Sequence, residues 1–327
     1  MSALETTPAN SSLRAKRAWH PLEWLFWAAA VASVFFLPSQ HSLLSQIAIW
    51  SLFALSLDLL LGYAGIVSLG HAAFFGAGAY AAGIFCKTVM PDPLAGMAVA
   101  IVVAALLGLL TSLLVLRGTD LTRLMVTLAV ALVLHEVANA LPHWTGGADG
   151  LQGMVVGPLL GRFEFDLYGR TAYAYSLVTL FVLFLLARLV VRSPFGLSLM
   201  AIRRNALRAA ALGVPVRRRL VAVYTLAASY AGAAGALLAQ TTGYVSLETL
   251  EFQRSADVLL ALIIGGVGWL YGGIVGALAF KLLQDILSTS SPQFWMLWMG
   301  VFLVALALVG RERLTAGVRG LVARVTR

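Results

Sequence analysis

The residues with the most obvious chemistry are His135 and Glu136, which begin like the zinc-binding pattern HExxH. The pattern fails at the position of the second histidine, where the chain has Asn139. A membrane-embedded enzyme built on this pair would need a third reacting group that the sequence does not supply. Glu136 lies about five residues from the end of an apolar run, so it is either an acid at the membrane interface or a group that lines a cavity.

Other reactive arrangements are missing from the sequence. The three lysines, Lys16, Lys87 and Lys281, never follow a glycine, so the chain lacks a phosphate-binding loop for ATP. Cys86 is the only cysteine, which excludes an intrachain disulfide and a cysteine-based metal site. We therefore expect a chain that is not an enzyme and that has no catalytic residue, no metal and no cofactor.

The composition places the chain in a membrane. Of its 327 residues, 60% are hydrophobic and only 11% are charged, which excludes a disordered chain and a soluble domain. The net charge of +9 is concentrated in the two termini and in residues 192–219. This distribution follows the positive-inside rule, and basic residues do not alternate with aromatic ones as they do where bases stack. We expect the bilayer as a partner and no nucleic acid.

Seven apolar runs are long enough, or nearly so, to cross a bilayer as helices. They cover residues 22–37, 43–61, 94–116, 124–141, 171–191, 220–240 and 294–309. We expect one transmembrane domain over residues 22–310, between a cytoplasmic tail at 1–21 and a basic cytoplasmic tail at 311–327. Residues 241–257, which follow an outward crossing, carry three acids and one arginine.

Two further apolar stretches, 62–86 and 258–283, are interrupted by glycines. Non-helical backbone at membrane depth is tolerated only where it is buried in protein or lines a watery cavity, and such breaks mark transport sites. We therefore predict a translocation path shaped by small and polar residues of these stretches. The candidates are Gly65, Ser68, Gly70, His71, Gly265, Gly266 and Gly268. For His71, a satisfied buried histidine is an equally good interpretation.

The basic segments 192–219 and 311–327 should both face the cytoplasm. This parity requires residues 258–283 to return to the outer side, as a re-entrant pair or as two tilted crossings. The predicted fold is an all-α polytopic membrane protein with about eight to ten transmembrane helices, glycine-broken or re-entrant segments, and cytoplasmic N- and C-termini. Broken segments in both halves are a weak indication of an internal repeat.

The segment 192–219 is the most polar stretch between apolar runs, with seven arginines and no acid. Its spacing predicts an amphipathic helix with an apolar face and with Arg203, Arg204 and Arg208 on other faces. The apolar face consists of Leu199, Ile202, Ala206, Ala209 and Ala210. Ser193 and Pro194 suit a helix start, and Gly213 suits its end. A helix of this kind is either a solvated loop that only fixes the topology or a docking helix for a cytosolic partner.

Four motifs, in this order, resemble a known family of membrane proteins. They are GYAGIVSLGHAAFFGAGAY at 62–80, TGGADGL at 145–151, SPFGLSLMAIRRNALRAAALGV at 193–214 and ADVLLALIIGGVGWLYGGIVGA at 256–277. The chain resembles the permeases of branched-chain amino acid ABC importers, most closely their M-type. The resemblance implies a bacterial cytoplasmic membrane, a second homologous permease, two cytosolic ATP-binding subunits and an extracytoplasmic substrate-binding protein.

The same resemblance implies that the arginine-rich loop docks on the ATP-binding subunits. The residues expected to form this coupling loop are Ser193, Pro194, Phe195, Gly196, Ile202, Arg203, Arg204, Ala209, Ala210 and Gly213. Two acids common in the family's loop are replaced here, at Ala206 and in the pair Ala210-Ala211. The more basic loop suggests an ATP-binding subunit with a more acidic cleft.

The substrate and the class of transporter stay open at this point. Members that resemble this family also move urea, amides or aromatic compounds. A stand-alone ion-coupled secondary transporter would fit the broken helices equally well. The scarcity of acids near the spans, with Asp58, Glu136 and Asp257 as the candidates, weighs against ion coupling.

Overall fold

The computed structural model describes residues 21–309 except residue 167. Helices dominate this part of the chain, and within it there is no β-strand beyond two isolated bridges. Six stretches are long and apolar enough to cross a membrane. The prediction of a helical polytopic membrane protein is therefore confirmed. The predicted tails, 1–21 and 311–327, lie outside the described residues apart from Pro21.

The six long stretches correspond to apolar runs predicted above, apart from the last, which was predicted as part of a glycine-broken run. They are Pro38–Ala64, which contains α3 (His41–Asp58), then α5 (Pro93–Val115), α6 (Asp120–Ala140), α8 (Arg170–Arg192), α11 (Val216–Thr242) and α13 (Leu270–Ser290). The remaining apolar helices are shorter: α2 (Pro21–Phe36), α4 (Ala72–Thr88), α12 (Phe252–Gly265) and α14 (Trp295–Val309).

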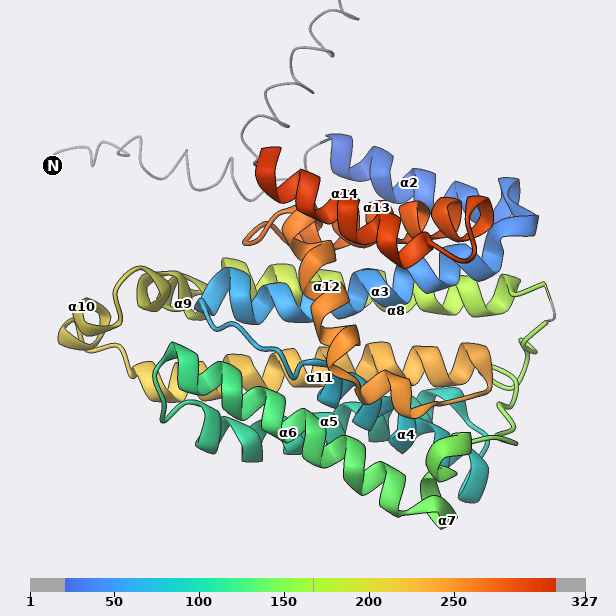
Figure 1. Cartoon of the computed structure of the whole chain (residues 1–327), viewed down its shortest axis with the longest axis horizontal. Coiled ribbons are helices and arrows are strands. Elements are labelled where there is room, and N and C mark those ends of the chain that lie inside the picture. The colour runs from blue at the N-terminus through green and yellow to red at the C-terminus, as the bar shows by residue number, and fades with distance from the viewer. Residues whose placement is uncertain (1–20, 167, 310–327) are drawn as a thin grey trace, which may run out of the picture.

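The long helices lie side by side around α3 and α11, which form the centre of the molecule (Figure 1). The span Pro38–Ala64 is hydrophobic all round and is almost entirely buried inside the molecule. This burial shows that the segment is enclosed by other helices of the chain rather than by lipid. Helix α3 packs against α8, α11 and α13, and α11 packs against α4 and α5. Helix α12 crosses the others steeply in Figure 1.

The helices break at both of the predicted glycine stretches. Helix α3 continues into the π-helical turn η2 (Leu59–Ala64), which ends at Gly65 with φ 76°. Residues 65–70 then run without helical structure until α4 begins. The second break separates α12 from α13, where Gly266 and Gly268 have φ 109° and 82°. Residues that carry a side chain larger than hydrogen rarely adopt such positive φ values, which explains why glycine occupies these positions.

The two halves of the chain share a short sequence motif and a similar turn at the end of a long helix. Gly65 begins the sequence GIVSL and Gly243 begins GYVSL. Both glycines have a left-handed backbone conformation and follow the end of a long helix. Gly65 follows α3 with its extension η2, and Gly243 follows α11. In each case the chain then turns back along the bundle and enters a shorter helix, α4 or α12 (Figure 1). The two turns start at opposite ends, because η2 contacts the arginine-rich loop whereas Val245 bridges to Leu151. This arrangement supports an inverted internal repeat.

Small residues allow α11 to pack closely against α4 and α5. A Cβ added at Gly235 would collide with the carbonyl oxygen of Phe75 and would lie 2.8 Å from the amide nitrogen of Ala79. Gly78 likewise faces the backbone of Gly232. Close backbone approach of this kind is how helices associate where lipid offers no hydrophobic driving force.

We predict that Gly235→Ala destabilises the protein by about 1–3 kcal/mol, because the new methyl group meets backbone atoms that cannot rotate away. The matched control is Gly300→Ala on α14, where an added Cβ has no neighbour within 4 Å. Thermal unfolding in mild detergent should show a lower melting temperature for the first variant only. Equal melting temperatures would refute close packing of α4 on α11.

Candidate functional site

The arginine-rich loop folds into two short helices, α9 (Pro194–Arg204) and α10 (Ala206–Ala211). Helix α9 begins as predicted, with the Ser193 hydroxyl accepting a hydrogen bond from the Phe195 N–H at 3.2 Å. The expected single helix is interrupted at Asn205, which is extended and caps α10 by accepting from the Arg208 N–H at 2.8 Å. Gly213 follows with φ 83°, consistent with the predicted end of the segment.

One side of this loop is held against the membrane helices. Leu199, Ile202 and Ala209 are buried, as the predicted apolar face requires. Ala206 and Ala210 are exposed and do not belong to that face, because the helix is interrupted at Asn205. Gly196 packs against the Val191 backbone. The loop is therefore anchored firmly to the end of α8 and to α11.

The opposite side of the loop is open. A hollow of about 380 Å³ separates α9 from α10. Its lining combines exposed apolar side chains with basic ones: Leu197, Met200, Arg204, Arg208 and Leu212. Apolar side chains exposed beside arginines are typical of a surface that binds a protein partner.

Arg203 leaves the loop in another direction and reaches both helix breaks. Its guanidinium donates a hydrogen bond to the carbonyl of Gly62, in the first break. The same nitrogen lies 3.1 Å from the position that a Cβ would take on Gly268, in the second break. The buried Asp58 completes the junction by accepting a hydrogen bond from the Gly268 N–H at 2.7 Å. The sequence grouped Arg203 with Arg204 on a polar outer face, but their guanidinium groups serve different surfaces.

Three path candidates of the first break, Ser68, Gly70 and His71, are closely packed in this single chain, whereas Gly65 is exposed. His71 is fully buried, its Nε2 lies 2.8 Å from the Ser56 hydroxyl, and its ring stacks on Phe53. Ser68 is also fully buried, and Gly70 lies against the backbone of Thr127. These residues fix the non-helical segment between α3 and α6. Their part in a translocation path stays a prediction.

The glycines of the second break have two structural roles, close helix packing and a turn of the backbone. Gly265 packs against the backbones of Gly272 and Gly276, so that α12 and α13 approach closely. Gly266 and Gly268 supply the positive φ values that turn the chain between the two helices. Their place in a path is likewise still a prediction.

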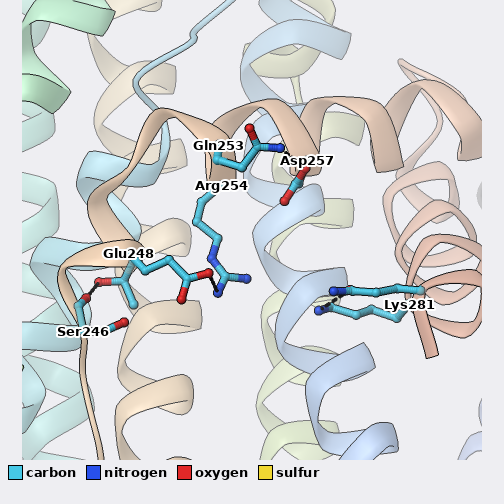
Figure 2. A network of polar contacts seen from close by, with 8 residues as sticks. Ser246, Glu248, Gln253, Arg254, Asp257 and Lys281 are labelled. Carbon is cyan, nitrogen blue, oxygen red and sulfur yellow. Dashed lines mark hydrogen bonds and ion pairs between the residues drawn. The ribbon is translucent and has the colours of Figure 1, made fainter. Parts of the chain in front are cut away.

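A cluster of charged side chains lies where α12 and α13 meet α3, and the sequence reasoning did not identify it. Figure 2 shows Glu248, Arg254, Asp257 and Lys281 directed toward the same space. Arg254 pairs with Glu248 at 2.7 Å, and Asp257 accepts a hydrogen bond from Gln253 at 3.0 Å. This cluster is polar although the helices around it are apolar.

Lys281 and Arg254 both lie over the indole ring of Trp50, at 4.2 and 5.6 Å from its centre. Trp50 is near the middle of the span Pro38–Ala64, and Lys281 is near the middle of α13. The cluster is therefore at mid-membrane depth. The sequence placed residues 241–257 after an outward crossing, but here Glu248, Arg254 and Asp257 return to this depth. The GYVSL sequence, so similar to GIVSL of the first break, was the signal that could have predicted the return.

His135 and Glu136 do not form a metal centre with other residues. His135 lines a hollow of about 220 Å³ between α6 and the start of α12, together with Glu251, whereas Glu136 is exposed. Among the described residues, no group of three or more histidine, cysteine or acidic side chains could hold a metal ion.

Comparison with known proteins identifies the family. Residues 40–308 match the family described as branched-chain amino acid transport system / permease component. The high-affinity branched-chain amino acid transport system permease protein LivM of Escherichia coli K12 is 26% identical over 289 residues, covering 80% of this chain and 66% of LivM. The probable branched-chain amino acid transport permease protein LivH of Methanocaldococcus jannaschii is 24% identical over 255 residues, covering 72% of this chain and 76% of LivH.

A LivM of Salmonella typhimurium is 27% identical over 290 residues, and the match again covers 66% of that protein, slightly less than two thirds. No solved structure matches the chain significantly. The family match covers α3 through most of α14, and therefore includes both helix breaks and the arginine-rich loop. The chain belongs to the family of permease components of branched-chain amino acid transport systems.

Proposed function

We propose that this chain is the membrane permease subunit of an ABC importer in a bacterial cytoplasmic membrane. It forms, with a second homologous permease, the translocation path for branched-chain or related amino acids. Two cytosolic ATP-binding subunits drive transport, and an extracytoplasmic binding protein delivers the substrate. The chain itself has no catalytic residue and no cofactor in this proposal. Family membership supports the assignment, and the junction at Arg203 is the structural observation that carries it.

The proposed topology has ten crossings, made by the six long helices and the four shorter ones, α2, α4, α12 and α14. Helices α4 and α12 each cross only part of the membrane, and the non-helical residues that precede them complete the crossing. With the arginine-rich loop in the cytoplasm, this count places both termini there as well.

The coupling loop is proposed to act through its two sides. The hollow between α9 and α10 docks on an ATP-binding subunit, with Arg204 and Arg208 facing acidic groups of that subunit. Arg203 joins the docked helix to both helix breaks. A displacement of α9 is thereby transmitted to both halves of the membrane domain through one guanidinium group.

Affinity purification of the tagged chain in mild detergent tests the assembly. We expect a second permease and two copies of an ATP-binding subunit to co-purify with it. The purified complex should take up radiolabelled leucine in proteoliposomes when ATP and the binding protein are present. Recovery of the chain alone, with uptake driven by an ion gradient, would instead identify a stand-alone transporter.

The double variant Arg204→Glu with Arg208→Glu should reduce the ATP-binding subunit recovered with the chain by about tenfold. Two exposed ion pairs and the added repulsion account for roughly 1–2 kcal/mol of docking free energy. The control is Arg162→Glu, a charge reversal at an exposed arginine on the other side of the membrane. Unchanged recovery in the double variant would exclude this face as the docking surface.

Arg203→Gln should have a different effect, because its side chain faces the breaks rather than the partner. We expect normal recovery of the ATP-binding subunit and a loss of ATP-driven uptake of about tenfold or more, as a hydrogen bond to a charged group contributes about 1.5–3 kcal/mol. Uptake at the wild-type rate would show that Arg203 does not transmit the motion.

A further inference from the structure

Two opposite charges in the cluster of Figure 2 lack an ionic partner. Arg254 and Glu248 neutralise each other, but the ion pairs formed within the described residues include neither Lys281 nor Asp257. Lys281 Nζ donates to the Gln284 side-chain oxygen at 2.9 Å, and Asp257 has only the amide of Gln253. The cluster thus places one positive and one negative group toward the same space without a direct ion pair to either of them among the described residues.

The position of these groups makes their retention costly. Lys281 is only 6% exposed and lies at mid-membrane depth, where charged side chains are rare and mark substrate pathways. Asp257 on α12 is half-buried and directed toward the same space, and its neighbour Gln253 is exposed. A face of α12 that carries these groups cannot lie against lipid tails. Under the proposed function, the second permease covers this face and water enters between the two chains.

We propose that Lys281 and Asp257 bind the zwitterionic head of an amino-acid substrate as it crosses the membrane, an inference that rests on the function proposed above. Lys281 receives the substrate carboxylate and Asp257 receives its ammonium group. Arg254, held over Trp50 and paired with Glu248, keeps the local charge balanced. The site reads the charges shared by all α-amino acids and excludes neutral amides and urea, which lack both.

A purely structural role for Lys281 makes the opposite prediction. Its alkyl chain and ammonium group pack on Trp50 and could serve only to fill space between α3 and α13. Replacement of a buried charge by an apolar residue of similar volume is often neutral or stabilising. Lys281→Met would then leave transport intact and the complex at least as stable.

Uptake of leucine by the assembled complex in proteoliposomes separates the two roles. We expect Lys281→Met and Asp257→Asn each to reduce the initial rate by at least about tenfold, with unchanged subunit assembly. The matched controls are Lys87→Met, at an exposed lysine bonded to the Gln152 carbonyl, and Asp285→Asn, at an exposed acid one turn from Lys281. Rates in Lys281→Met or Asp257→Asn that equal those of their controls would overturn the site.

Thiol labelling decides the question if the charge variants do not assemble. Cys86 is the only cysteine, so Cys86→Ser provides a cysteine-free background for Gln253→Cys beside Asp257. A water-soluble, positively charged methanethiosulfonate should label the new thiol in the complex. Millimolar leucine should slow labelling, and leucinamide, which lacks the carboxylate, should not. An unreactive thiol, or equal protection by the two compounds, would overturn the proposal.

These results are distinguishable from failure of the proposed function. If the wild-type complex does not take up leucine with ATP, the assignment as an amino-acid importer fails. If the wild-type complex transports leucine and Lys281→Met transports it equally well, only the binding site fails.

Discussion

The structure depends on the need to satisfy backbone polar groups inside a bilayer, where no water is available to them. The chain interrupts its helices twice and so releases N–H and C=O groups at each break. Arg203 donates to the Gly62 carbonyl, Asp58 accepts from the Gly268 N–H, and the first N–H of α4 donates to the Ser255 hydroxyl at 2.8 Å. Each partner belongs to a different element from the group it satisfies. The breaks are therefore stable only while the whole bundle is assembled.

The same requirement connects the loop to the membrane domain. A guanidinium that satisfies one break and touches the other cannot move without affecting both. The remaining surface of α9 and α10 is free for a partner. Arg203 thus contacts the helix breaks, while its neighbour Arg204 lines the hollow that we propose as the docking face. Small residues on α11 let α4 approach closely, so displacement of one element is passed on by backbone contacts rather than by flexible side chains.

The second half of the molecule brings charged side chains to mid-membrane depth. Residues that follow Gly243 return into the bundle and bring Glu248, Arg254 and Asp257 beside Lys281. Such a face needs protein or water against it, because lipid cannot solvate it. The first half uses the equivalent segment differently. It buries Ser68 and His71 in tight packing, whereas the second half brings charged side chains together.

The sequence alone determined the helical membrane fold, the glycine breaks, the start of α9 at Ser193 and the family. These follow from local properties: the length of apolar runs, the conformational freedom of glycine and the capping ability of serine. The interruption at Asn205, the inward direction of Arg203 and the mid-membrane position of Arg254 and Asp257 came only from the tertiary structure. The partners of Arg203 and Asp58 lie 141 and 210 positions away along the chain, and no local pattern encodes such distant contacts.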